Sequence, residues 1–157
     1  MKPGPASSWP FPRWWAWLAP LGYLLHFAEE ALAGGGFVAW SRLHLSESFS
    51  DARFAAINAI ALSIVVVLAA IASKKGREWL MLPPFAVLTL NGVLHAASSV
   101  ATHSYSPGLV TGMLLYVPIG GFTLWRAARA VPRGILFGAL GAGLIAHGVV
   151  SWIAFRG

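Results

Sequence analysis

Residues 54–73 read FAAINAIALSIVVVLAAIAS, a 20-residue stretch with one amide side chain and no charged residue. A helix needs roughly 20 mostly apolar residues to cross a bilayer, so this stretch predicts a membrane-spanning helix. Similar segments recur at residues 14–33, 79–102, 109–125 and 134–155. The sequence therefore predicts an all-α fold, a polytopic bundle of about five transmembrane helices, in a single domain covering residues 1–157.

The composition agrees with a protein of the bilayer. The chain is 57% hydrophobic and 10% charged, with a mean hydropathy of +0.69. It contains no cysteine, which excludes disulfides, thiolate metal sites and cysteine nucleophiles, so any metal must bind through nitrogen and oxygen. The pI of about 10.6 does not indicate a nucleic-acid partner, because the basic residues lie between the apolar segments. The expected partners are membrane lipid and a lipophilic small molecule.

The basic residues also predict an orientation. Three of them, Arg42, Arg53 and Arg156, fall on one side of the expected bundle. The other eight fall on the opposite side: Lys2, Arg13, Lys74, Lys75, Arg77, Arg126, Arg129 and Arg133. By the positive-inside rule, the N-terminus is expected in the cytoplasm and the C-terminus outside, in a multi-pass protein of the cell (inner) membrane.

A cleaved signal peptide is the competing interpretation of the first segment, because Ala31-Leu32-Ala33 before Gly34 resembles a cleavage site. A histidine and two glutamates interrupt the end of that apolar run, which favours a retained helix.

Ionisable residues inside the apolar segments are the main functional signal, because they are costly in lipid. In the run His26-Phe27-Ala28-Glu29-Glu30, helical geometry places the histidine and both glutamates on the same half of the helix. In the third segment a polar stripe consists of Asn91, His95, Ser98 and Thr102. The fifth segment contributes His147 and Ser151, and the second contributes Asn58.

Counting residues along each predicted helix places these polar residues at a similar depth in the membrane. At ~1.5 Å per residue from the cytoplasmic end, His26 lies ~18 Å deep, Glu30 and His95 ~24 Å, and His147 ~20 Å. Asn58 lies roughly 6 Å from the outer end, near the same plane of a ~30 Å hydrocarbon layer. The sequence thus predicts a shared site in the outer half of the bilayer, although helix-to-helix hydrogen bonding is an adequate explanation for His147 or Asn58 alone.

The charge balance of this level points to three possibilities. None of the five segments contains Lys or Arg, so the glutamates must be protonated, compensated by imidazolium, or neutralised by a metal cation. The metal hypothesis assigns His26, Glu30, His95 and His147 as ligands of a divalent ion such as zinc, iron or manganese. Glu29, Glu30 and Asn91 are then the candidate catalytic residues, with Glu29 as general acid or base.

Three functions follow from these possibilities. The first is an intramembrane metal-dependent enzyme acting on a small lipophilic substrate. The second is a metal-free isomerase, cyclase or hydrolase in which Glu29 or Glu30 acts as the acid. The third is a proton- or ion-coupled carrier, or a sensor, for which five helices without repeats are a poor scaffold.

The motifs also carry a family resemblance. The runs His26-Phe27-Ala28-Glu29-Glu30, Asn91-Gly92-Val93-Leu94-His95 and Tyr105-Ser106-Pro107-Gly108, with Pro118 and His147 downstream, resemble the HXXEE family of small bacterial multi-helix membrane proteins. The members of that family are mostly uncharacterised. The resemblance implies an intramembrane site at His26, Glu29, Glu30, Asn91, His95 and His147, without implying a reaction. A fainter similarity to the emopamil-binding sterol isomerases rests on the spacing of His26 and Glu30.

Overall fold

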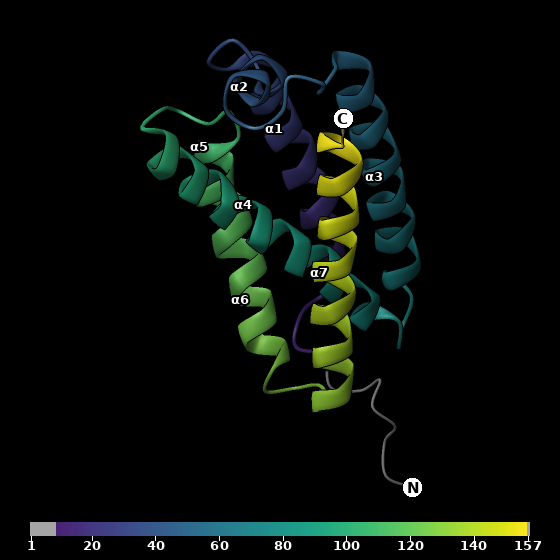
Figure 1. The fold of residues 1–157 in the computed structure, drawn as a ribbon. Helices are drawn as coiled ribbons and strands as arrows, with labels where there is room; N and C mark the ends of the chain where they lie inside the picture. Colours follow the sequence, from purple (N-terminus) through teal and green to yellow (C-terminus); the bar gives the residue numbers. More distant parts are fainter. Residues whose placement is uncertain (1–8, 157) are drawn as a thin grey trace, which may run out of the picture.

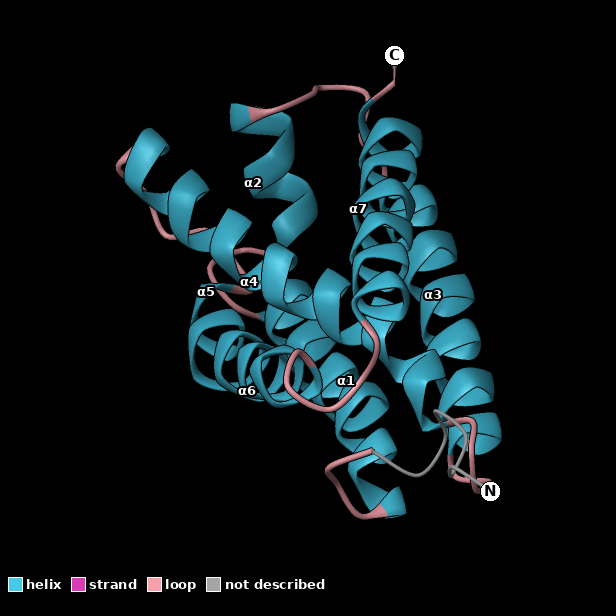
Figure 2. Cartoon of the chain, turned by 90° about the horizontal axis from the view of Figure 1, so that it is seen from below, coloured by secondary structure: helices cyan, strands magenta, loops and turns pink. Residues whose placement is uncertain are grey.

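The computed structural model describes residues 9–156 and confirms the all-α prediction, since the described residues form helices and loops and no strand (Figures 1 and 2). Lys2, which was counted in the charge argument, lies outside the described residues, and the orientation of the termini stays a prediction. The elements in chain order are η2 (Arg13–Trp17), α1 (Leu18–Leu32), α2 (Phe37–His44), α3 (Asp51–Ala72), η3 (Glu78–Met81), α4 (Leu82–Thr102), α5 (Leu109–Thr111), the π-helical segment η4 (Gly112–Tyr116), α6 (Val117–Ala127) and α7 (Arg133–Phe155).

Within residues 9–156, four helical segments are long and apolar enough to cross a membrane: residues 51–72, 78–102, 109–127 and 133–155. They correspond to four of the five predicted spans. The first predicted span is different, because its α-helical part, α1, has 15 residues and covers only about 22 Å. The five-residue 3₁₀ turn η2 precedes α1 and adds about 10 Å, so the two together approach the thickness of the hydrocarbon layer.

Helix α4 lies at the centre of the bundle. It packs against α6, α7 and η4, while α3 packs mainly against α1 and the short turns η2 and η3. Small residues allow the closest approach, because a Cβ on Gly92 of α4 would lie 2.7 Å from the carbonyl oxygen of Gly112. This contact brings the π-helical segment η4 against the middle of α4, one turn from His95.

The π-helical segment η4 ends at the residue before α6 begins. Pro118, the second residue of α6, has no N–H to offer the carbonyl one turn earlier, which disrupts regular α-helical hydrogen bonding in this stretch. Single π turns occur frequently at functional sites. Here η4 positions Tyr116, and the short helix α5 before it positions Thr111.

The short helix α2 was not predicted, because its eight residues are too few to give a clear periodic pattern. It closes the end of the bundle where α1 ends and α3 begins, which we call the α2 end (Figure 1). Val38 of α2 packs there with Phe49, Phe54 and Ala154 in a buried apolar cluster. Three glycines with positive φ, Gly34, Gly35 and Gly36, form the tight connection from α1 into α2.

Candidate metal centre

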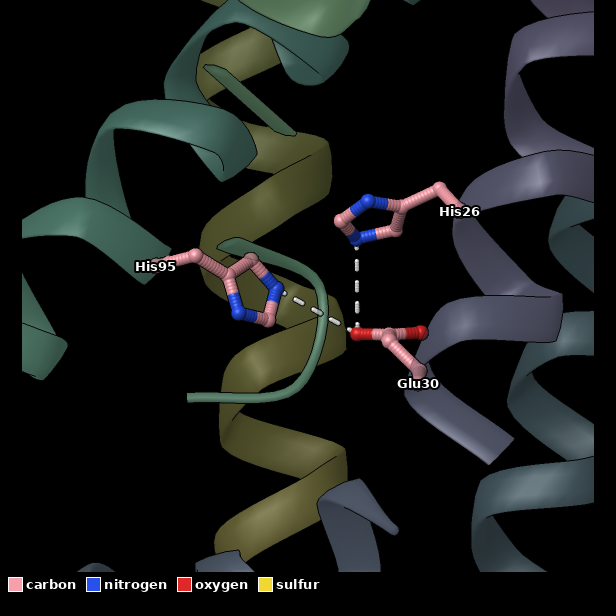
Figure 3. A group of neighbouring side chains, drawn as sticks. All are labelled: His26, Glu30 and His95. Carbon is pink, nitrogen blue, oxygen red and sulfur yellow. Dashed lines mark ion pairs between the residues drawn. The ribbon is translucent and has the colours of Figure 1, made fainter. Parts of the chain in front are cut away.

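Three side chains converge near the α2 end of the bundle. His26 and Glu30 lie one turn apart on α1, and His95 approaches from α4 (Figure 3). The Oε1 atom of Glu30 lies 3.5 Å from His26 Nε2 and 3.3 Å from His95 Nε2. All three residues are buried, with exposed fractions of 4 to 6%. The structure thus brings together three of the residues that the depth argument placed at one level in the first and third predicted spans.

The two separations from Glu30 Oε1, 3.3 and 3.5 Å, are longer than a typical hydrogen bond and close to the spacing of ligand atoms around a metal ion. Donor and acceptor in an N–H···O hydrogen bond are typically about 2.7–3.2 Å apart. By contrast, ligand atoms placed tetrahedrally at about 2.0–2.1 Å from zinc lie roughly 3.3–3.4 Å from one another. The ligand atoms of His26, Glu30 and His95 all lie within 4.8 Å of one another, and this group could hold a metal ion.

A chain of hydrogen bonds sets the tautomer of His26. The Thr111 hydroxyl donates to Glu29 Oε2 at 2.5 Å, so its only proton is committed. The hydroxyl oxygen of Thr111 also lies 2.8 Å from His26 Nδ1. It can only accept a hydrogen bond there, so the ring proton of His26 must be on Nδ1. A neutral His26 then turns the bare lone pair of Nε2 toward the Glu30 carboxylate, and Nε2 has no hydrogen-bond partner among the described residues. Two electron-rich atoms facing each other need a cation or a proton between them.

The imidazole of His95 is oriented in a similar way. Its Nδ1 lies 3.0 Å from the Ser106 hydroxyl, and the Ser106 N–H donates to Ser99 Oγ at 3.0 Å. The ring of Phe37 from α2 packs beside the imidazole, with the ring centroids 5.2 Å apart. Both histidines thus use Nδ1 for a hydroxyl in the segment between α4 and η4 and direct Nε2 toward Glu30, an arrangement common in metal-ligating histidines.

Glu29 has a different environment from its neighbour Glu30. Its Oε1 accepts hydrogen bonds from the Tyr105 hydroxyl and from the N–H groups of Gly108 and Val110. Its Oε2 accepts from the N–H and the hydroxyl of Thr111. Partial burial and the hydrogen bond to Glu29 raise the pKa of Tyr105 to about 12, so that hydroxyl keeps its proton and donates. The structure therefore gives Glu29 five donors and makes it the anchor of the 105–111 segment.

Three further residues expected at this level lie beside the cluster. Asn91 and His147 line the adjoining cavity, but neither belongs to the group of three ligand atoms within 4.8 Å. The role of His147 as a fourth ligand stays a prediction. Asn58 accepts a hydrogen bond from the Tyr23 hydroxyl at 2.8 Å and donates to the carbonyl of Phe54, which links α3 to α1. This linkage is the helix-bonding role expected for Asn58.

The cluster opens onto a cavity of about 400 Å³ between α1, α3, α4 and α7. Its lining is mostly apolar, and among the residues that line it Glu30 is the only one with a carboxylate, while none is Lys or Arg. No Lys or Arg of this cavity therefore compensates a charge on Glu30.

Sequence reasoning missed the residues that position the histidines. Ser106 and Gly108 lie in the loop between α4 and α5, where no helical periodicity reveals which side chain faces the site. Thr111 ends the three-residue helix α5, at the start of the fourth predicted span, and nothing in that span marked it as a partner of His26. Gly108 has a φ of +103°, and a Cβ there would lie 2.7 Å from His95 Cε1 and 2.8 Å from His26 Cε1. The signal that could have found it is the Ser-Pro-Gly turn at 106–108 preceding a short helix.

Substituting Gly108→Ala should push both imidazoles out of position. We expect at least a roughly tenfold loss of divalent-ion affinity, in line with disturbance of the groups that orient metal ligands. Gly35→Ala is the matched control, because Gly35 also has a positive φ, +83°, but a Cβ there meets nothing within 4 Å. The measurement is chelator competition for zinc on both purified variants. Equal losses in the two would mean that backbone strain, and not contact with the histidines, is responsible.

Comparisons with known proteins place the chain in a family. It matches the model of the family described as "Protein of unknown function with HXXEE motif" over residues 17–123, more than half of its length. The matched region includes the whole motif and His95, whereas His147 lies beyond it. No curated protein and no solved structure matches the chain, so the fainter resemblance to sterol isomerases gains no support. His26, Glu29 and Glu30, the residues that define the motif, are those that build or anchor the cluster, and the chain belongs to the HXXEE family.

Proposed function

We propose that this protein is an intramembrane metal-dependent enzyme that acts on a small lipophilic substrate. The observation that carries the proposal is the preset cluster of two imidazole Nε2 atoms and one carboxylate oxygen, buried without a Lys or Arg partner. A divalent cation held by His26, Glu30 and His95 would pair at once with the carboxylate and with the unpartnered Nε2 of His26. Zinc, iron and manganese all accept nitrogen and oxygen ligands of this kind.

Three protein ligands also leave room for chemistry. Catalytic zinc sites typically use three protein ligands and keep a further position for water or substrate. In such a site the ion polarises a substrate oxygen or lowers the pKa of a water molecule. The open side of this cluster faces the 400 Å³ cavity, whose apolar lining selects for a lipophilic substrate.

A second, smaller cavity supports one-sided access to the cluster. It has a volume of about 310 Å³, and Glu30 lines it together with Gly35 and Gly36 at the α2 end. Arg42 and Asp51 also line it and form an exposed ion pair at 3.3 Å. Water and ions therefore have a polar approach to Glu30 from this end.

The opposite end of the bundle is packed with apolar side chains. Met81 and Phe85 are fully buried there, together with Ala69 and Ala72 of α3. The cluster thus has a polar approach from one end of the bundle and an apolar cavity on its other side. This arrangement suits an enzyme better than a carrier, because a carrier needs polar access from both membrane faces.

Within this proposal Glu29 is a positioning residue. Its carboxylate holds Thr111, and Thr111 in turn holds the tautomer of His26. The earlier hypothesis of Glu29 as general acid or base is less compatible with five donors on its two oxygens. Glu30 is the motif glutamate that lines the cavity proposed to bind the substrate.

Substitutions of the two motif glutamates should have different effects on metal binding. Glu30→Gln removes the charged ligand and should abolish stoichiometric zinc in elemental analysis of the purified protein. Glu29→Gln places an amide NH₂ against N–H and O–H donors, disturbs Thr111, and should weaken zinc affinity about 10- to 100-fold without abolishing it. His147→Ala should retain zinc.

Purified wild-type protein that binds neither zinc, iron nor manganese would contradict the proposal. It would favour the metal-free alternative, in which Glu30 shares a proton with the two imidazoles and acts as the acid. Loss of metal in His147→Ala would instead add His147 to the ligands.

Access to the cluster can be tested because the chain has no cysteine background. Ala39 lines the smaller cavity and Ala61 the larger one. In sealed vesicles, Ala39→Cys should react with a charged, membrane-impermeant thiol reagent from one face only. Ala61→Cys should react with a hydrophobic maleimide and not with the charged reagent from the opposite face. Charged-reagent labelling of Ala61→Cys from both faces would favour the carrier.

A further inference from the structure

The lining of the large cavity changes character along its length. On α4 the lining residues run from Ser98, His95 and Asn91 near the α2 end to Val87 and Pro83 at the other end. On α3 they begin with Phe54 and Ile57, and continue through Asn58 to Ala61, Ile64, Val65 and Leu68. Beyond Asn58 and Asn91 the lining side chains of both helices are apolar. The polar groups of these two helices therefore lie beside the cluster of His26, Glu30 and His95. From there toward Leu68 the lining is hydrocarbon, while aromatic residues such as Phe49 and Phe54 line the cavity at the α2 end.

The dimensions of the cavity favour a narrow, extended occupant. The lining residues on α3 span residues 54 to 68, or about 21 Å of helix. The apolar part alone, from Asn58 to Leu68, covers about 15 Å. A volume of about 400 Å³ lies near the lower limit of typical ligand pockets, which run from about 300 to 1,000 Å³. A long cavity of small volume fits one chain and excludes a two-chain phospholipid.

Some polar side chains that line this cavity have buried atoms without a hydrogen-bond partner among the described residues. Among the described residues, the buried side-chain atoms without a hydrogen-bond partner include Asn91 Oδ1, Tyr116 Oη and His26 Nε2. These three residues all line the large cavity. Tyr116 stacks on His26 with the ring centroids 4.3 Å apart, and Asn91 lies one turn below His95 on α4. Unpartnered buried polar groups are costly, so a ligand that pairs with them is favoured over a plain hydrocarbon.

We propose that the substrate is a single-chain amphiphile, bound with its polar head at the metal cluster and its tail along α3 and α4 toward Leu68. Its head carries an oxygen that binds the metal and a hydrogen-bonding group that meets Asn91 or Tyr116. This inference rests on the proposed function for the head, whereas the tail site depends only on the cavity.

The tail site is tested with two alanine substitutions on the same helix. Ala61 lines the cavity, whereas Ala59, two residues away on α3, is exposed and does not line it. The probe is dodecanohydroxamic acid, a single-chain compound whose head binds divalent metals, added to zinc-loaded protein in detergent. Ala61→Phe fills the cavity and should weaken binding at least about tenfold with zinc content unchanged, while Ala59→Phe should bind like wild type. Equal binding by Ala61→Phe and wild type would overturn the tail site.

A measurement on the wild-type protein covers the case in which Ala61→Phe fails to fold. A dodecyl alcohol with a diazirine at the chain end is photolysed with the metal-stripped protein, and the labelled residues are mapped by mass spectrometry. The expected labels fall on the lining residues of the apolar part, which are Ala61, Ile64, Val65, Leu68, Pro83, Pro84, Val87 and Leu88. Labels confined to lipid-facing positions such as Val67 and Ile145 would overturn the proposed binding mode. Because this arm needs no metal, a protein that binds no zinc but shows the expected labels refutes the proposed function and leaves the tail site standing.

Discussion

A buried carboxylate facing two imidazole nitrogens is the constraint on which the rest of this structure depends. Glu30 has an exposed fraction of 6%, and its Oε1 lies 3.3 and 3.5 Å from the two Nε2 atoms. An isolated charge in an apolar surrounding is strongly unfavourable, and the cavity lining offers no Lys or Arg to compensate it. The proposed cation, bound by His26, Glu30 and His95, would offset this cost with the groups already in place.

Much of the surrounding architecture maintains this geometry. Glu29 holds the 105–111 segment through five hydrogen bonds, and that segment supplies the hydroxyls of Ser106 and Thr111 that orient the imidazoles. Gly108 leaves the space into which the two rings extend. The two glutamates of the motif thus have different roles: Glu30 belongs to the candidate metal-binding group, and Glu29 holds the segment whose hydroxyls orient the two imidazoles. This division explains why a motif would require two consecutive carboxylates.

The sequence predicted the helices and the cluster because both follow from periodicity and depth. His26 and Glu30 are four residues apart on one helix, and counting residues brought His95 to their level. It did not predict α2, which is too short for a periodic pattern, or the shortened α-helix of the first span, which depends on the local 3₁₀ turn η2. The hydroxyl partners of the histidines were equally hidden, because the facing of a loop side chain is set by tertiary packing. Polarity alone also placed Glu29 in a catalytic role, since it does not reveal how many donors a carboxylate meets.

X-ray absorption at the zinc edge of the zinc-loaded, purified protein tests the central claim most directly. The account predicts one zinc per chain with a first shell of nitrogen and oxygen at about 2.0–2.1 Å. It also predicts outer-shell scattering from two imidazoles, reduced to one in His95→Ala. Bound zinc without imidazole scattering, or a wild-type spectrum unchanged by His95→Ala, would contradict it.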